Sequence, residues 1–153
     1  MFDIAEEYGT SVFKECVALG QSHYEEVEDK ASVVPYAVNY DTIEAADSHG
    51  MIALVTVRKD GELVGYMANL ICEDFLTSQL EAKEIGIYLS PEARGSSAFI
   101  RMMSLMEHVV ISRGAKAQYL MFKNGHDVGL AERLGYTKTE TVYQKLLGVT
   151  WQQ

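Results

Sequence analysis

Hydrophobic residues recur at about every fourth position near the start of the chain. The stripe consists of Ile4, Tyr8, Val12, Cys16 and Leu19. An apolar stripe with this period is typical of an amphipathic helix, although two glycines that weaken a helix fall within it. The pattern therefore predicts one or two helices within the first 29 residues.

Polar residues set the limits of the next predicted helix. Residues 33–35, Val-Val-Pro, indicate extended chain. Asp41 is then a candidate N-cap, and Glu44, three residues later, completes a capping box. These residues predict a short helix that ends near Gly50.

The pattern changes to that of a sheet in the middle of the chain. Residues 51–57 are apolar and β-branched, and residues 63–72 return as a partner strand. The dipeptide Asp60-Gly61 between them favours a tight hairpin turn, because such a turn needs residues with positive φ. Residues 84–89 are a further predicted strand, which Ser90-Pro91 ends.

Helices and strands alternate in the second half. One helix is predicted from an apolar face that consists of Phe99, Met102, Met103, Met106 and Val110. Gly114 follows at the position where a glycine commonly ends a helix. Residues 117–122 predict a strand, residues 126–134 a short helix and residues 139–147 a last strand. A strand, a helix and a second strand in this order predict a βαβ unit with parallel strands.

The predicted fold class is α+β, with mixed strand directions. It consists of N-terminal helices, a central antiparallel hairpin, the βαβ unit, a further helix and a last strand. No linker or repeat interrupts the pattern, so we expect a single domain over residues 1–153.

Composition and charge narrow the classes of function. The 153 residues carry 13 Lys and Arg against 22 Asp and Glu, a net charge of −9, which disfavours a broad nucleic-acid-binding surface. Cys16 and Cys72 are unpaired and the four histidines are scattered, so no metal site is expected. The N-terminus lacks the basic and apolar regions of a signal peptide, and no apolar run approaches the ~20 residues that span a bilayer. We therefore expect a cytoplasmic protein without a membrane contact.

Residues 92–97, between the strand and the methionine-rich helix, are mostly small and polar, and this is the segment that indicates a particular chemistry. Such a turn at a helix N-terminus presents backbone N–H groups, which with the helix dipole bind anions without any net positive charge. The segment lacks the lysine of a phosphate-binding P-loop. The alternative is an ordinary connection in which Ser96 or Ser97 caps the helix.

The run Glu84 to Gly95 resembles the acetyl-CoA-binding motif of the GNAT superfamily of N-acetyltransferases, a strand ending near Pro-Glu followed by Gln/Arg-x-x-Gly-x-Gly/Ala and a long helix. Leu134-Gly135-Tyr136 and the hairpin around Asp60-Gly61 also resemble family motifs, so the resemblance covers about residues 50–147. It implies a GNAT-like fold in which two parallel strands diverge and acetyl-CoA lies between them.

The resemblance also implies which residues bind acetyl-CoA. The backbone of the first parallel strand pairs with the pantetheine, and the loop and helix start hold the pyrophosphate. Asn124 reaches the ligand from beside the second strand. The strand and loop residues so implied are Ile87, Tyr88, Leu89, Arg94, Gly95, Ser96, Ser97, Ala98 and Phe99.

The sequence departs from the family pattern at three places. Ser97 and Phe99 stand where the motif has small residues, and the frequent catalytic tyrosine before Leu-Gly is absent. For catalysis the resemblance implies Glu84 as a base or water-holding group. Tyr143, on the predicted last strand, is the candidate acid, with Tyr136 or bulk water as alternatives.

The function implied is an acetyl-CoA-dependent N-acetyltransferase that moves an acetyl group to an amine of a small molecule, a peptide or a protein. The alternative is a binding module with weak or no activity that acts through a protein partner. A homodimer is equally compatible with the sequence.

Overall fold

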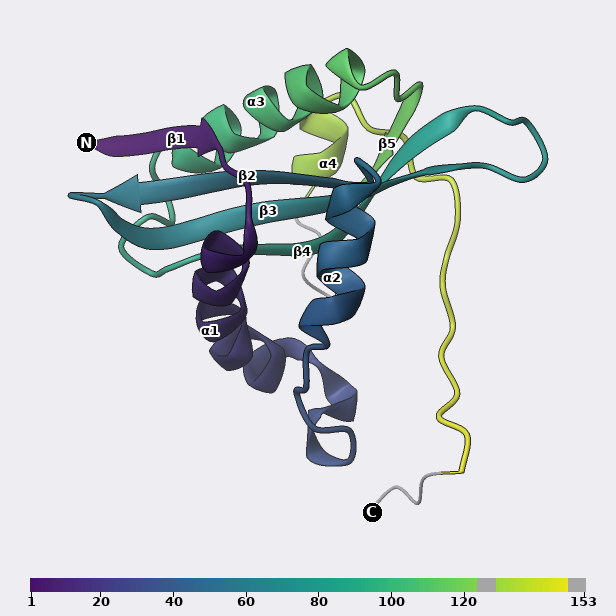
Figure 1. Cartoon of the computed structure of the whole chain (residues 1–153), viewed down its shortest axis with the longest axis horizontal. Coiled ribbons are helices and arrows are strands. Elements are labelled where there is room, and N and C mark those ends of the chain that lie inside the picture. Colours follow the sequence, from purple (N-terminus) through teal and green to yellow (C-terminus); the bar gives the residue numbers. More distant parts are fainter. Residues whose placement is uncertain (124–128, 149–153) are drawn as a thin grey trace.

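The computed structural model describes residues 1–123 and 129–148, in which one mixed sheet has helices on both faces (Figure 1). The strands are β1 (Phe2–Glu6), β2 (Ile52–Lys59), β3 (Glu62–Glu73), β4 (Leu80–Leu89) and β5 (Ala117–Tyr119). The helices are α1 (Thr10–Val27), α2 (Tyr40–Ser48), α3 (Ala98–Ser112) and α4 (Leu130–Arg133), with a 3₁₀ turn at Asp29–Ser32. The strands lie in chain order, antiparallel from β1 to β4, and β5 is parallel to β4. The predicted α+β class is confirmed.

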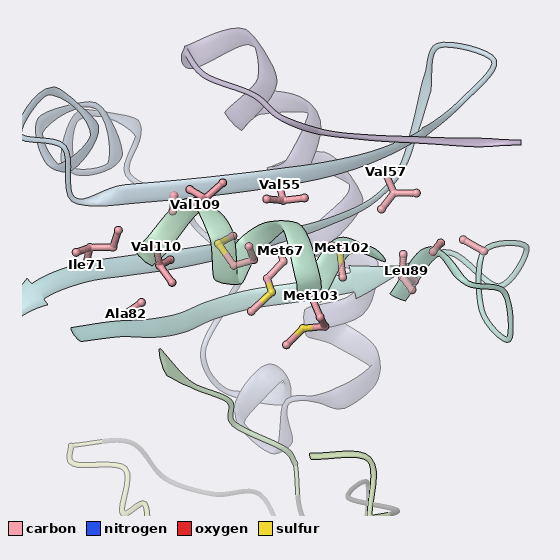
Figure 2. Packing of buried hydrophobic residues seen from close by; sticks show 14 of the residues in the cluster. Val55, Val57, Met67, Ile71, Ala82, Leu89, Met102, Met103, Val109 and Val110 are labelled. Carbon is pink, nitrogen blue, oxygen red and sulfur yellow. The ribbon is translucent and has the colours of Figure 1, made fainter. Parts of the chain in front are cut away.

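Apolar side chains pack on both faces of the sheet. On one face α3 contributes its buried residues Ala98, Met102, Met103, Met106, Val109 and Val110. Figure 2 shows Met102, Met103, Val109 and Val110 of α3 packed against strand residues such as Val55, Met67 and Ile71. On the other face Phe13 of α1 belongs to a second cluster with Tyr66 of β3. The helix predicted from the methionine pattern is therefore confirmed, and it packs on one face of the sheet against β1, β2 and β3.

The chain begins with a strand, which corrects the prediction of helix from residue 4 onward. β1 pairs with β2, with Phe2 opposite Lys59 and Glu6 opposite Val55. Phe2 and Ile4 pack against the α3 side of the core, and the residues between them are exposed. This alternation has the period of a strand. The edge of β2, about 50 residues away in the sequence, gives the segment a partner that the local pattern could not show.

Helix α1 continues through Gly20 without a break. Gly20 is buried, and a Cβ atom there would lie 2.5 Å from the hydroxyl oxygen of Tyr66. The glycine therefore allows α1 to approach β3 closely, and it does not end the helix.

The cap of α2 differs from the predicted capping box. The side-chain oxygen of Asn39 accepts hydrogen bonds from the backbone N–H groups of Asp41 and Thr42, at 3.0 and 3.4 Å. Glu44 instead accepts a hydrogen bond from the hydroxyl of Thr10, at 2.7 Å. Asn39 is the N-cap because its side chain reaches the free N–H groups of the first turn. The helix itself is present, as predicted.

The βαβ unit is confirmed, but its second strand is short and the predicted last strand is absent. β5 has three residues instead of the predicted 117–122. Residues 139–147 contain no strand or helix, and the last described part of the chain runs away from the sheet (Figure 1). A strand requires a neighbour to pair with, and this segment has none in the described part of its own chain.

The hairpin turn has the predicted form. Asp60 and Gly61 have φ values of 51° and 84°, and they join Lys59 to its partner Glu62. Positive φ at both positions is the property of a type I′ turn, whose twist matches that of the flanking strands.

Gly61→Val is expected to lower the free energy of unfolding by more than about 1 kcal/mol, because a β-branched residue is strained at positive φ. No described atom lies within 4 Å of a Cβ at this position, so the penalty comes from the backbone alone. Urea unfolding measures the change. Gly61→Asn is the control, since asparagine tolerates this conformation; equal losses in both variants would contradict the assignment.

Candidate functional site

The parallel strands β4 and β5 pair over only three residues each. The pairs run from Glu81 with Ala117 to Lys83 with Tyr119, whereas β4 continues to Leu89. Beyond these pairs the two segments enclose a cavity of about 490 Å³. Its lining comes from α1, β4, the β4–α3 loop, α3 and the residues after β5, and consists of His23, Glu26, Val27, Glu84, Ile87, Tyr88, Leu89, Arg94, Phe99, Leu120, Met121 and Phe122.

An ion pair joins two sides of this cavity at one end. The Nζ atom of Lys123, which follows the wall after β5, lies 2.6 Å from Oε1 of Glu28 at the end of α1. The contact links the end of α1 to the segment after β5, next to the lining residues Val27 and Phe122.

A bulge in β4 shapes the cavity wall. Glu84 lies opposite Asn69 and Gly86 lies opposite Ala68, so the intervening Ile85 has no partner in β3. Such an extra residue shifts the alternation of side chains along a strand. Ile87 beyond the bulge packs on the α3 side of the sheet, the side to which Ala82 before the bulge also belongs. The bulge thus places Glu84 and Ile87 on the same side of the strand.

Glu84 is the buried acid of the cavity, with 7% of its surface exposed. Burial raises the pKa of its carboxyl group to about 7 because the charged form loses hydration. The backbone N–H of Met121 and the Lys123 ammonium favour the charged form, while Glu28 disfavours it. A carboxyl group with a pKa near neutrality can both accept and release a proton at physiological pH.

Asn69 was not identified from the sequence and lies directly across the sheet from Glu84. It is fully buried, and neither its side-chain nitrogen nor its oxygen has a hydrogen-bond partner within the described residues. Side chains at opposed positions of neighbouring strands have Cβ atoms about 4.5–5.5 Å apart, close enough for an amide to reach a carboxyl group. An amide can donate to a carboxylate and accept from a carboxylic acid. Only the strand register reveals this neighbour.

His23 is a second titratable group of the cavity that the sequence did not mark. Its ring centroid lies 5.3 Å from that of Tyr88, edge to face. Burial lowers the pKa of His23, which keeps the imidazole neutral and able to accept a proton. A single histidine in an amphipathic helix belongs to no motif, so only the packing of α1 on β4 brings it here.

The loop between β4 and α3 is held by its own side chains. Nε of Arg94 donates to the carbonyl of Leu89 at 2.8 Å, and the guanidinium carbon lies 5.7 Å from the centroid of the Tyr88 ring. The hydroxyl of Ser96 donates to the carbonyl of Ala93 at 2.7 Å and accepts from the N–H of Ala98 at 3.1 Å. Arg94 is therefore fixed against the cavity wall.

Ser96, and not Ser97, caps helix α3 with its side chain. Ser97 has helical backbone angles and makes no capping hydrogen bond. The amide of Ala98 is taken by Ser96, so it is not free for a ligand as the resemblance implied. Within the described residues no acceptor pairs with the backbone N–H groups of Gly95, Ser96, Ser97 or Phe99. Unpaired donors at a helix N-terminus can bind an anion, so the geometry is compatible with the anion-binding surface expected from the sequence.

Several of the predicted residues do not line the cavity, among them the loop residues Gly95, Ser96, Ser97 and Ala98. Tyr143 is 92% exposed in the segment after α4, which corrects its placement beside the cleft. Tyr136 packs against the core and accepts a hydrogen bond from Nε2 of Gln118 at 2.7 Å. Asn124 lies outside the described residues. The predicted strand, loop and helix residues 87–89, 94 and 99 do line the cavity.

The parallel strands β4 and β5 diverge around a cavity, and the N-terminus of α3 carries unpaired backbone N–H groups. These two features are those of the class of acyltransferase folds that the sequence resembles. The chain matches the model of the acetyltransferase (GNAT) family over residues 16–136. The chain therefore belongs to the GNAT acetyltransferase family. No curated protein sequence matches it.

Solved structures show the same fold at low sequence identity. An aminoglycoside acetyltransferase from an uncultured soil metagenomic sample is 12% identical, with a TM-score of 0.76 over 97% of this chain and 99% of that one. A transcriptional regulator from Bacillus halodurans C-125 is 14% identical, with a TM-score of 0.74 over 96% and 100%. Glucosamine-6-phosphate N-acetyltransferase from Arabidopsis thaliana is 14% identical, with a TM-score of 0.66 over 95% and 98%. At these identities the likeness concerns the fold alone.

Two negative findings hold for residues 1–123 and 129–148. None of their helices is long and apolar enough to cross a membrane. They contain no group of three or more His, Cys, Asp or Glu side chains that could hold a metal ion.

Replacing Glu84 with Gln is expected to stabilise the protein at pH 8. The folded-state pKa of about 7 lies above the ordinary 4.5, so Glu84 favours folding at low pH and loses this contribution as the pH rises from about 4.5 to 7. Glu84→Gln should therefore raise the free energy of unfolding by about 2–3 kcal/mol at pH 8 and by little at pH 4.5. Thermal unfolding at both pH values measures this.

The control is Glu62→Gln, which removes an exposed carboxylate at the hairpin. It should leave the difference between the two pH values unchanged. Equal melting temperatures of Glu84→Gln and the parent protein at pH 8 would show that the carboxyl group is not buried.

Proposed function

We propose that the protein is an acetyl-CoA-dependent N-acetyltransferase that acts on an amine. The observation that carries the proposal is the cavity between β4 and the segment after β5, which is lined by the buried acid Glu84 and by Arg94 and Phe99 beside the unpaired backbone donors at the start of α3. Family membership supplies the reaction class. The unpaired N–H groups at the start of α3 are the proposed site for the pyrophosphate, and Glu84 lies where the acetyl end is proposed to react.

The residues present fit acetyl-CoA in two respects. Free N–H groups at Gly95, Ser96, Ser97 and Phe99 suit a pyrophosphate, and they need no net positive charge. Beyond Lys83 the backbone of β4 has no pairing partner in β5, so its groups at residues 87–89 can pair with the amides of a pantetheine arm. When bound, acetyl-CoA supplies an acetyl group as a thioester.

Arg94 provides the positive charge of this site. Its Nε atom is engaged by the carbonyl of Leu89, and the rest of the guanidinium lies beside the Tyr88 ring at the cavity wall. A guanidinium fixed in this way can orient a phosphate group while the amides hold it. Ser97 and Phe99 are tolerated in place of the family's small residues because the backbone, and not the side chain, carries the donors.

Glu84 is the proposed base. An amine must lose a proton when its nitrogen forms an amide, and a carboxyl group with a pKa near 7 can take that proton directly or through water. His23 faces the same cavity and is the second candidate for this role. Tyr88 is the one tyrosine among the described residues that lines the cavity, so Tyr88 or water is the proposed proton donor to the departing thiolate.

The acceptor is proposed to be a cationic amine. Glu26 and Glu84 line the cavity, and the chain as a whole carries a net charge of −9. A negative field of this kind attracts protonated amines, and Glu84 can then remove the proton that prevents reaction. The aminoglycoside acetyltransferase with the same fold is named for an acceptor of this chemical kind, which supports the proposal without identifying the substrate.

Ser97→Pro is expected to abolish acetyl-CoA binding and leave the fold intact. The substitution removes one of the unpaired N–H donors, and the φ of −70° at this position suits proline at a helix start. Ser97→Gly is the matched control, because it removes the side chain and keeps the donor, and it should hold or improve affinity. Titration calorimetry with acetyl-CoA measures both. Equal affinities of Ser97→Pro and the parent protein would remove the pyrophosphate from this loop.

The pH dependence of kcat/KM should show a base with an apparent pKa near 7. Because Glu84 must be ionised to accept a proton, the rate should fall about tenfold per unit below this pH. Glu84→Gln should lower kcat/KM by roughly 10²–10⁴-fold and remove the acidic limb. If the limb persists in Glu84→Gln and disappears in His23→Gln, His23 is the base.

A further inference from the structure

Asn69 is a fully buried amide in a part of the sheet that is otherwise apolar. In the strand register it lies opposite Ala53 of β2 on one side and opposite Glu84 of β4 on the other. Its neighbours along the same face of β3 are Met67 and Ile71, which belong to the core that α3 covers (Figure 2). The buried residues of α3 are all apolar as well. Glu84 is therefore the one polar side chain among these neighbours of Asn69.

Asn69 and Glu84 are two of the three polar or charged side chains that are buried within the described residues, and the third is Thr56. The hydroxyl of Thr56 donates to the carboxylate of Glu7, so its polar atom has a partner. Neither the nitrogen nor the oxygen of the Asn69 amide has one within the described residues. A buried amide without a hydrogen bond destabilises a folded protein. The place of Asn69 across from Glu84 therefore suggests a role connected with that carboxyl group.

We propose that Asn69 is a positioning residue for Glu84, and that its side-chain amide binds the carboxylate through one buried water molecule. The inference rests on the proposed function, in which Glu84 is the base. The two side chains share no direct hydrogen bond, and Glu84 lines the cavity, from which water can reach it. A buried water commonly bonds to polar groups that are otherwise unsatisfied. The amide N–H donates to this water, and the water donates to the carboxylate.

The other groups that act on Glu84 come from different elements. The backbone N–H of Met121 and the ammonium of Lys123 favour the charged carboxylate, and Glu28 at the end of α1 disfavours it. Further titratable or charged groups near it are His23, Glu26, Tyr88 and Arg94 of the cavity lining and Tyr66 of β3. Asn69 is not part of the cavity lining, so it contacts Glu84 from behind and does not touch the substrate. Because it is neutral, it can hold the carboxylate without adding a charge to the core.

An amide that holds a base in this way favours the ionised form of the base. Hydrogen bonds to a charged group are roughly twice as strong as those between neutral groups, so the contact is stronger before Glu84 takes up a proton than after it. In the proposed reaction the proton passes from the amine nitrogen to a carboxylate oxygen of Glu84, which becomes a carboxylic acid. Asn69 neither gains nor loses a proton. Loss of the amide should therefore raise the pKa of Glu84 and leave the binding of acetyl-CoA unchanged.

Asn69→Leu tests this role, because leucine has the same branched shape and lacks the polar atoms. The carboxyl carbon of Glu84, followed by ¹³C NMR, should titrate about one pH unit higher in this variant than in the parent protein. The acidic limb of kcat/KM should move by the same amount, whereas the dissociation constant of acetyl-CoA, measured by calorimetry, should stay the same. A residue that only fills space would move neither midpoint.

Met67→Leu is the matched control. It changes another buried residue on the same face of β3 by a substitution that cores tolerate, and it should leave both midpoints where they are. The parent protein gives a second measurement, which does not depend on whether a variant folds. The side-chain NH₂ signals of Asn69 should shift with pH at the same midpoint as the carboxyl carbon of Glu84, and this shift should be absent in Glu84→Gln.

Asn69 signals that stay constant while Glu84 titrates would overturn the proposal. So would an unchanged midpoint in a folded Asn69→Leu variant, or an equal change in Met67→Leu. The NMR measurements need neither acetyl-CoA nor turnover, so they separate this inference from the proposed function. If the two side chains titrate together in a protein that transfers no acetyl group, the contact is supported and the proposed function is contradicted.

Discussion

The separation of β4 from β5 is the constraint on which the rest of the site depends. Pairing stops after Lys83 and Tyr119, although β4 remains paired with β3 as far as Leu89. A buried backbone that loses its partner must find another, from side chains, water or a ligand. The opening therefore accounts for the cavity and for the free edge of β4, and Glu84 lies buried at the point of divergence.

Elements with strong local signals could be predicted from the sequence. The Asp60-Gly61 turn, the methionine face of α3 and the order of strand, loop and helix around residues 84–98 depend on neighbouring residues, and all three are present. The structure of residues 2–6 and 139–147 could not be predicted in the same way, because whether a strand forms depends on a distant partner. β2 provides that partner for residues 2–6, whereas no described segment of the chain provides one for residues 139–147.

The residues of the site also fall into two groups, those that a contiguous motif marks and those that only the fold brings together. Glu84 and the loop at 94–99 follow from a contiguous motif, so the resemblance located them, but it could not show that the Ser96 side chain occupies the Ala98 amide. Asn69 and His23 carry no motif and enter through the register of β3 against β4 and through the packing of α1 on β4. Neither residue is distinctive in the sequence. The fold places Asn69 opposite the buried Glu84 and His23 in the lining of the cavity. Tyr143 is the opposite case. It was a catalytic candidate because of a predicted last strand, but residues 139–147 form no strand with the described part of the chain.

We propose that acetyl-CoA binds between β4 and β5 with its phosphates on the start of α3. This proposal is tested most directly by the change in backbone amide NMR signals when acetyl-CoA is added to the protein labelled with ¹⁵N. The largest shifts are expected on Gly95, Ser96, Ser97 and Phe99, with further shifts at residues 87–89 and none at the distant Asp60-Gly61 turn. The absence of shifts at residues 95–99 in the presence of saturating acetyl-CoA, or shifts confined to another face of the molecule, would contradict it.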